Sequence, residues 1–112
     1  MEDLTFDLYY KKEKLAHITV NNNKVQVENY TASKIFNPFL IKNVTKETVI
    51  EFLKNRCFEY SRPDKKELLE RLGLKEYSIV DIVKKTHGVM AEDHVWIKFE
   101  GEDICYEELF DR

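Results

Sequence analysis

The chain has 112 residues, which suits one domain and is too short for two domains with separate cores. Hydrophobic residues make up 43% of it and charged residues 35%, as is typical of a folded protein and not of a disordered chain. The formal net charge is only −3, so no overall basic excess favours nucleic acid or an anionic membrane as a partner. We therefore expect a single domain over residues 1–112 that binds neither.

The first thirty residues predict an antiparallel meander of three strands. Residues 4–10 carry an apolar side chain at every second position, which is the period of a strand with one buried face. Residues 15–20 are apolar and β-branched enough for a second strand. The asparagines at 21–23 tolerate a left-handed turn, and Val25 and Val27 begin a third strand after it.

The segment that follows the meander has no clear period. Residues 35–41 place apolar side chains around Pro38, which cannot continue a central strand. We expect an irregular, partly buried connection that crosses the core. An exposed apolar patch at this place would instead mark a surface for a partner.

Two short helices are predicted next. Thr45 precedes an apolar stripe at helical spacing, and this first helix should end near Cys57. Ser61 and Asp64 match the spacing of a capping box, so the second helix should start there. Gly73 stands where a left-handed residue is needed to end that helix.

A third helix and a final hairpin complete the predicted fold. Ser78 is spaced as the N-cap of a helix over residues 79–86, and Gly88 should close it. Residues 95–99 read as a strand, and residues 104–106 can pair back on it after an acidic turn. We therefore predict an α+β fold with an N-terminal antiparallel three-stranded meander, three short helices and a C-terminal β-hairpin.

The sequence contains no recognisable motif for catalysis, a cofactor or a metal. Three glycines are too few for a phosphate-binding loop. Cys57 and Cys105 belong to no paired motif and read as free thiols, while His87 and His94 fit no standard metal spacing. His17 lies in the second strand with no other histidine or cysteine near it, so we give it no role. We expect no cofactor and no enzymatic activity.

The best candidate site combines five residues from the second half of the chain. They are Arg56, Arg62, His87, Asp93 and Trp96. The two arginines could hold a phosphate or carboxylate, because a guanidinium binds planar oxyanions in bidentate fashion. Alternatively, an Arg–Asp pair and a capping histidine lock the last strand onto the helices. The tryptophan is either an exposed binding residue or part of the core.

Four stretches in the second half of the chain form a distinctive pattern. They are residues 52–56, the Ser61-Arg62 pair, residues 87–98 and the ending 109–111. This pattern resembles the N-terminal accessory region, or small companion protein, of HipA-like serine/threonine kinases in Firmicutes, over roughly residues 50–111. That family carries an arginine, Ser-Arg, a G-L-S-L-x-D-x-Y-W-I-K run and an acidic, aromatic ending. Here Val89-Met90-Ala91 replaces Leu-Ser-Leu, and Val95 replaces the tyrosine.

The resemblance implies a stand-alone relative of that region, because the chain has no kinase catalytic segment. Our first hypothesis is a small non-enzymatic protein-interaction module, a regulatory or antitoxin-like partner of a HipA-like kinase. A second is a phage- or mobile-element-encoded inhibitor of a host defence effector, such as an anti-CRISPR protein. A third is an anion- or nucleotide-binding protein or enzyme that uses the arginine cluster. The N-terminus has no basic and apolar leader, so we expect a cytoplasmic location.

Overall fold

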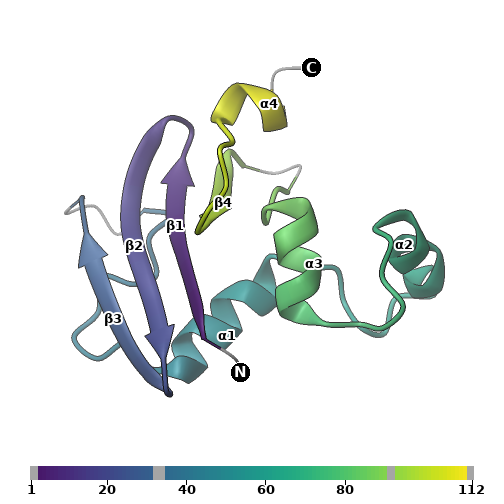
Figure 1. The fold of residues 1–112 in the computed structure, drawn as a ribbon, viewed down its shortest axis with the longest axis horizontal. Helices are drawn as coiled ribbons and strands as arrows, with labels where there is room; N and C mark the ends of the chain where they lie inside the picture. Colours follow the sequence, from purple (N-terminus) through teal and green to yellow (C-terminus); the bar gives the residue numbers. More distant parts are fainter. Residues whose placement is uncertain (1–2, 32–34, 91–92, 111–112) are drawn as a thin grey trace.

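The computed structural model describes residues 3–31, 35–90 and 93–110. Along the chain the elements are β1 (Leu4–Tyr10), β2 (Glu13–Asn21), β3 (Lys24–Asn29), α1 (Lys46–Asn55), α2 (Lys65–Arg71), α3 (Ile79–Thr86), β4 (Val95–Phe99) and α4 (Tyr106–Phe110). The strands form one antiparallel sheet in the order β3-β2-β1-β4, and α1 and α3 pack on one side of it (Figure 1). The predicted α+β class and N-terminal meander are confirmed.

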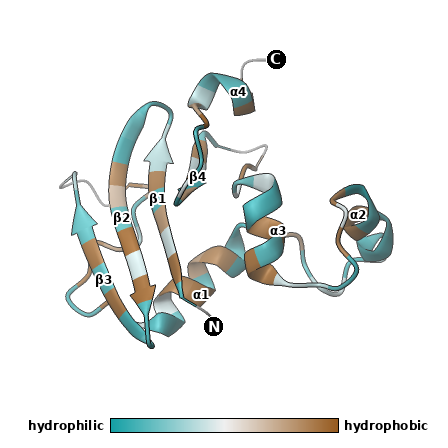
Figure 2. Ribbon diagram, in the orientation of Figure 1, coloured by the Kyte–Doolittle hydropathy of each residue, from teal (hydrophilic) through white to brown (hydrophobic). Residues whose placement is uncertain are grey.

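The core lies between the sheet and helices α1 and α3. Alternate residues of β1, such as Phe6 and Leu8, are fully buried. Figure 2 shows hydrophobic residues recurring along β1 and β2. Val49 and Leu53 of α1 and Val83 of α3 complete the same buried cluster. Burial of this size contributes roughly 1.5–3 kcal/mol for each large side chain. The period-two pattern of the sequence therefore fixes which face of the sheet the helices cover.

The predicted C-terminal hairpin is wrong. β4 pairs with β1 instead, with Ile97 opposite Leu8 and Phe99 opposite Phe6, because this pairing extends the apolar face of the sheet. On the outer side of β4 the Ile97 N–H donates to the His87 carbonyl, over 2.8 Å. The Glu102 carboxylate accepts from the Phe99 N–H, over 2.7 Å, so the chain after β4 supplies a side chain and not a strand. Residues 102–105 are irregular and lead into α4.

Of the two N-caps predicted from the sequence, Ser61 and Ser78, the structure confirms Ser78, and it adds an N-cap at Thr45. Thr45 caps α1 in a reciprocal capping box with Thr48, and Ser78 accepts from the backbone at the start of α3. The predicted start of α2 is wrong, because α2 begins at Lys65 and no side chain caps it. The Asp64 carboxylate that was expected to close a capping box binds the Arg62 guanidinium instead.

The connector from residue 35 to residue 45 is irregular, as predicted, and is buried only at its centre. Phe39 is fully buried, whereas Ile41 is 53% exposed. Asn37, which is also buried, donates to the Asn29 side chain and accepts from the Phe39 N–H, each over 3.0 Å. These bonds fix the connector to the end of β3. Residues 32–34 lie outside the described part of the chain.

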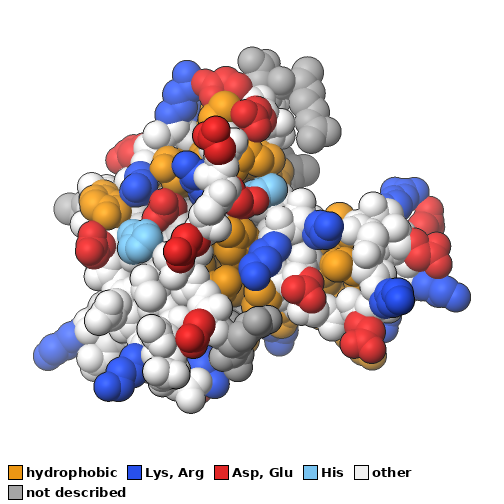
Figure 3. Space-filling view, in the orientation of Figure 1, with side chains coloured by type: hydrophobic (Ala, Val, Ile, Leu, Met, Phe, Trp, Pro, Cys, Tyr) orange, Lys and Arg blue, Asp and Glu red, His pale blue; other side chains and the backbone are white. Residues whose placement is uncertain are grey.

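Residues 58–78, which include α2, project from the rest of the molecule, and we call this segment the arm. Figures 1 and 3 show the arm standing apart from the sheet, with charged side chains over its outer end. Only Leu69 of α2 is buried. At its base the Tyr77 hydroxyl donates to the Phe58 carbonyl, over 2.7 Å, and the two rings meet edge to face. No helix within the described ranges has both the length and the apolar character needed to span a bilayer.

Candidate functional site

Arg56 lies at the C-terminal end of α1 and connects three segments of the chain. Its Nη1 and Nη2 donate to the two carboxylate oxygens of Asp93, each over 2.9 Å. Its Nε donates to the Gly88 carbonyl over 2.7 Å, and Nη2 also donates to the Val95 carbonyl over 3.1 Å. Four of the five N–H donors of the guanidinium are therefore used within the protein.

The bidentate pair is largely enclosed, with the side chains of Arg56 and Asp93 exposed by 10% and 23%. The hydrogen bond from the Arg56 guanidinium is the main cause that lowers the pKa of Asp93 below its ordinary value. Asp93 also accepts from the Val95 N–H, over 3.1 Å, at the start of β4. The arrangement fixes β4 against α1, and Asp93 occupies the guanidinium of Arg56. This geometry matches the alternative in which an Arg–Asp pair holds the last strand against the helices, and not the alternative of a ligand site.

His87 and Gly88 form the turn between α3 and the approach to β4. Both have positive φ, +57° and +67°, so the chain reverses within two residues. The His87 ring forms a hydrogen bond with the Glu102 carboxylate, over 2.7 Å. The ring takes no part in the hydrogen bonds of the Arg56 guanidinium. A side chain at position 88 would approach Ile97 Cδ1 to 3.0 Å and Arg56 Cβ to 3.4 Å. Glycine is required here both by the backbone conformation and by the close approach of β4.

Arg62 and Trp96 lie apart from the pair of Arg56 and Asp93. Arg62 sits on the arm, where it binds Asp64 in an exposed ion pair. Trp96 is 2% exposed, stacks on Tyr9 with ring centroids 4.4 Å apart, and donates from Nε1 to the Lys11 carbonyl. The tryptophan is therefore buried, although it lies outside the core cluster between the sheet and the helices, and the five candidate residues do not converge on one cavity.

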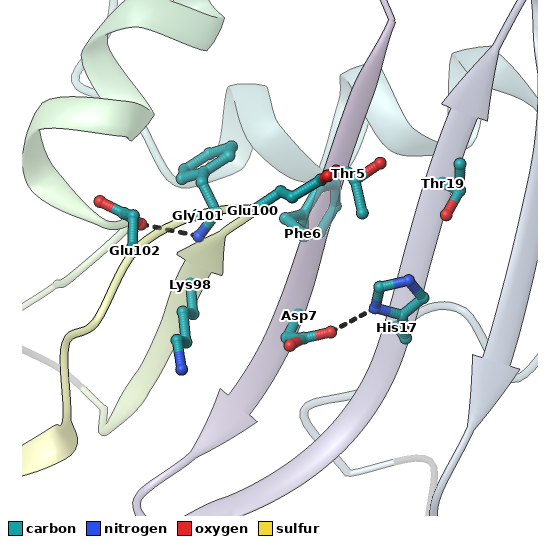
Figure 4. Close-up of a pocket in the computed structure, with 10 residues that line it drawn as sticks. Thr5, Phe6, Asp7, His17, Thr19, Lys98, Glu100, Gly101 and Glu102 are labelled. Atoms are coloured by element: carbon teal, nitrogen blue, oxygen red, sulfur yellow. Dashed lines mark hydrogen bonds and ion pairs between the residues drawn. The ribbon is translucent and has the colours of Figure 1, made fainter.

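The face of the sheet opposite the helices carries a row of ionisable side chains that the sequence interpretation missed. Glu28, His17, Asp7 and Lys98 occupy paired positions on β3, β2, β1 and β4. Figure 4 shows Asp7 and His17 pointing toward each other, with Nδ1 and Oδ1 2.5 Å apart. Asp7 lies between His17 and Lys98 in this row, and a carboxylate opposite a lysine is a stabilising cross-strand pair. The pair of Asp7 and His17 could have been predicted from the register of the β1–β2 hairpin, which places these two residues opposite each other.

This open face forms a shallow hollow of about 520 Å³. A carboxylate that orients a histidine can contribute to acid–base chemistry when a reacting group lies within reach. The nearest hydroxyls in the register belong to Thr5 and Thr19, which face each other two residues farther along the strands. No cluster of three or more metal-ligating side chains occurs within residues 3–31, 35–90 and 93–110.

A larger groove of about 940 Å³ lies between α1, the start of α3 and the base of the arm. Its apolar lining is formed by Cys57, Phe58, Tyr60, Tyr77, Ile79 and Met90. Tyr60 is 65% exposed and packs edge to face on Tyr77, while the Lys65 ammonium lies 3.5 Å from the centroid of the Tyr60 ring. Lys54 and Arg62 lie among its polar lining residues. An exposed aromatic ring beside an apolar groove is typical of a protein-binding surface.

Comparison with known proteins adds no assignment. No family model, curated protein or solved structure matches the chain. The chemistry of the groove is therefore the basis for its proposed function.

Cys57 is an apolar part of the groove lining. Burial raises the pKa of the Cys57 thiol to about 11, so at neutral pH it is protonated and contributes a small apolar side chain rather than a nucleophile. The sequence offered no signal for the groove, because residues 57–63 follow neither a helical nor a strand period.

Proposed function

We propose that the chain is a protein-interaction module that binds a partner through the groove at the base of the arm. The observation that carries this proposal is the exposed Tyr60 beside the apolar lining of the 940 Å³ groove. Isolated exposed apolar residues are common on proteins, but an aromatic side chain at an apolar hollow is the usual anchor point of an interface. Tyrosine is favoured there because it buries a large area at a low cost in side-chain entropy.

The chemistry of the groove suggests the kind of segment it accepts. Its floor is aromatic and aliphatic, and Lys54 and Arg62 add positive charge to its lining, where Glu59 adds one negative charge. A partner segment with one apolar anchor flanked by acidic residues would satisfy both properties, since complementary charge steers association and fixes register. The guanidinium of Arg56 does not contribute to anion binding in this proposal, because Asp93 already occupies its enclosed fork. Arg62 also binds a carboxylate, that of Asp64, but this pair is exposed to solvent and therefore weak, so a partner's carboxylate can compete for it.

The sequence resemblance suggests a HipA-like serine/threonine kinase as the partner. The chain would then act as a regulatory or antitoxin-like companion that binds the kinase without catalysing a reaction. The resemblance and the groove share two residues, since Ser61 and Arg62 carry part of the resemblance and also line the groove.

Co-purification with the HipA-like kinase of the native host tests this proposal. The tagged chain should retain the kinase, and Tyr60→Ser should weaken the complex at least about tenfold, because it removes the anchor ring. Tyr60 is mostly exposed, so the variant should keep the fold, which circular dichroism can verify.

Tyr30→Ser is the matched control for this experiment. Tyr30 is also an exposed tyrosine, at 52%, but it directly follows β3, across the molecule from the arm (Figure 1). Its substitution should leave kinase binding unchanged. The proposal fails if the unaltered chain does not retain the kinase, or if both variants retain it equally well.

A further inference from the structure

The outer edge of β3 is a second surface that the groove does not involve. β3 is the last strand of the sheet on that side (Figure 1). The two-residue turn at Asn22 and Asn23 makes Asn21 and Lys24 a hydrogen-bonded pair. The alternation of an antiparallel ladder then directs the N–H and C=O groups of Val25 and Val27 outward. Within the described ranges, no backbone hydrogen bond joins either of these residues to another segment.

The sequence of β3 is complementary to itself when read in the antiparallel direction. If two copies pair about a twofold axis through Gln26, Lys24 of one copy faces Glu28 of the other. Val25 then faces Val27 of the second copy, and Gln26 faces itself. Charges of opposite sign therefore meet at both ends of the paired segment, and the pairing is isologous, as in most twofold dimers.

The direction of the backbone groups agrees with this register. A hydrogen-bonded pair in an antiparallel ladder needs both residues to present N–H and C=O to the partner. Val25 and Val27 are the residues that do so, and the twofold axis at Gln26 places them opposite each other. Charge and hydrogen-bonding geometry thus select the same register.

The apolar side of the same edge supports a second copy as the occupant. Val25 and Val27 line a groove of about 690 Å³ together with Phe39, Ile41 and Val44 of the connector. Paired residues of neighbouring strands point to the same face of a sheet. The two valines of the second copy would therefore lie beside this groove and beside Ile41, which is 53% exposed.

We propose that β3 pairs with β3 of a second copy of the chain, which joins two four-stranded sheets into one continuous sheet. The edges of short strands give small interfaces, so the dimer should form at high concentration and dissociate on dilution. The pairing would bury the open edge, which otherwise remains a site for unspecific strand pairing.

Sedimentation equilibrium from about 1 µM to about 1 mM tests the dimer, because small interfaces associate in this range. Lys24→Glu and Glu28→Lys should each raise the dissociation constant about tenfold, since each places like charges opposite each other twice. An equimolar mixture of the two variants should associate at least as tightly as the original chain, because the charges then match again. The double variant Lys24→Glu/Glu28→Lys should also dimerise normally.

Two further variants make the result specific to this edge. Val27→Pro removes an outward N–H that the β2 ladder does not use, so it should give a folded monomer. Lys66→Glu makes the same charge change as Lys24→Glu on the exposed surface of α2 and should not affect association. A chain that stays monomeric up to about 1 mM, or charge variants that all dimerise like the original, would overturn the proposal.

Discussion

At the scale of single residues, Arg56 holds together parts of the chain that are far apart in sequence. Its guanidinium contacts Gly88, Asp93 and Val95, more than thirty positions away. A charge-assisted bidentate pair in a largely enclosed place is strong when complete and costly when one partner is removed. The exposed pair of Arg62 and Asp64 has a similar geometry but faces solvent, so it contributes little.

Asp93→Asn should lower the free energy of unfolding by about 2 kcal/mol at pH 7, because it leaves a largely buried guanidinium without its carboxylate. In the original chain the pKa of Asp93 is lowered from 3.8, chiefly by the hydrogen bond from Arg56. Its contribution is therefore complete above the ordinary pKa of the unfolded chain and disappears as the pH falls through the lowered value. The difference in the free energy of unfolding between the original chain and Asp93→Asn should therefore disappear as the pH falls through that acidic range.

Urea denaturation from pH 7 down to pH 2 measures this difference, and the acid limit follows from the ordinary carboxyl pKa. Asp64→Asn is the matched control, because it removes a bidentate carboxylate from a solvent-exposed pair. Its effect at pH 7 should be clearly smaller than that of Asp93→Asn. Equal effects of the two variants, or a constant gap at all pH values, would contradict the locking role of Arg56.

Gly88 tests how closely β4 approaches the end of α3. Gly88→Ala should destabilise the protein by about 1 kcal/mol through its left-handed backbone and by about 1 kcal/mol more through contact with Ile97. Gly73 has a similar φ, +74°, but a side chain there meets nothing within 4 Å. Gly73→Ala should therefore cost only the backbone contribution. Thermal unfolding of both variants compares them, and equal losses would show that the space around Gly88 is not limiting.

At the scale of elements, the sequence predicts local structure well and pairing partners poorly. The alternation over residues 4–10 gives β1 at its observed bounds, and the cap at Ser78 gives α3. The C-terminal hairpin was predicted wrongly because neighbouring strands usually pair, whereas β4 gains more apolar contact from β1. The candidate residues show the same limit, since spacing alone cannot reveal that Arg62 projects on the arm while Arg56 faces Asp93.

The arm should open more easily than the sheet. α2 buries only Leu69, whereas β1 and β2 bury a side chain at almost every second position. Elements with few buried contacts exchange their amide protons through local opening and not through global unfolding. Native-state hydrogen exchange should therefore show α2 amides exchanging orders of magnitude faster than those of β1. Similar protection in both elements would mean that the arm is an integral part of the core.

At the scale of the whole molecule, two separate surfaces carry the proposed interactions. The groove at the base of the arm offers an aromatic anchor for a different protein, and the outer edge of β3 offers backbone groups to a second copy. In Figure 1 the arm and β3 lie at opposite ends of the molecule, so a dimer formed through β3 would place its two arms far from its axis. Paired grooves would increase the apparent affinity for a dimeric partner.

Site-specific photocrosslinking in cells that contain the partner tests the central claim most directly. A photoreactive phenylalanine analogue replaces Tyr60 in the groove or, in a second sample, Glu13, which is exposed at the start of β2. We expect a covalent adduct with the HipA-like kinase from position 60 and none from position 13. If position 60 forms no adduct with the kinase, or position 13 forms the same adduct equally well, the groove is not the binding surface.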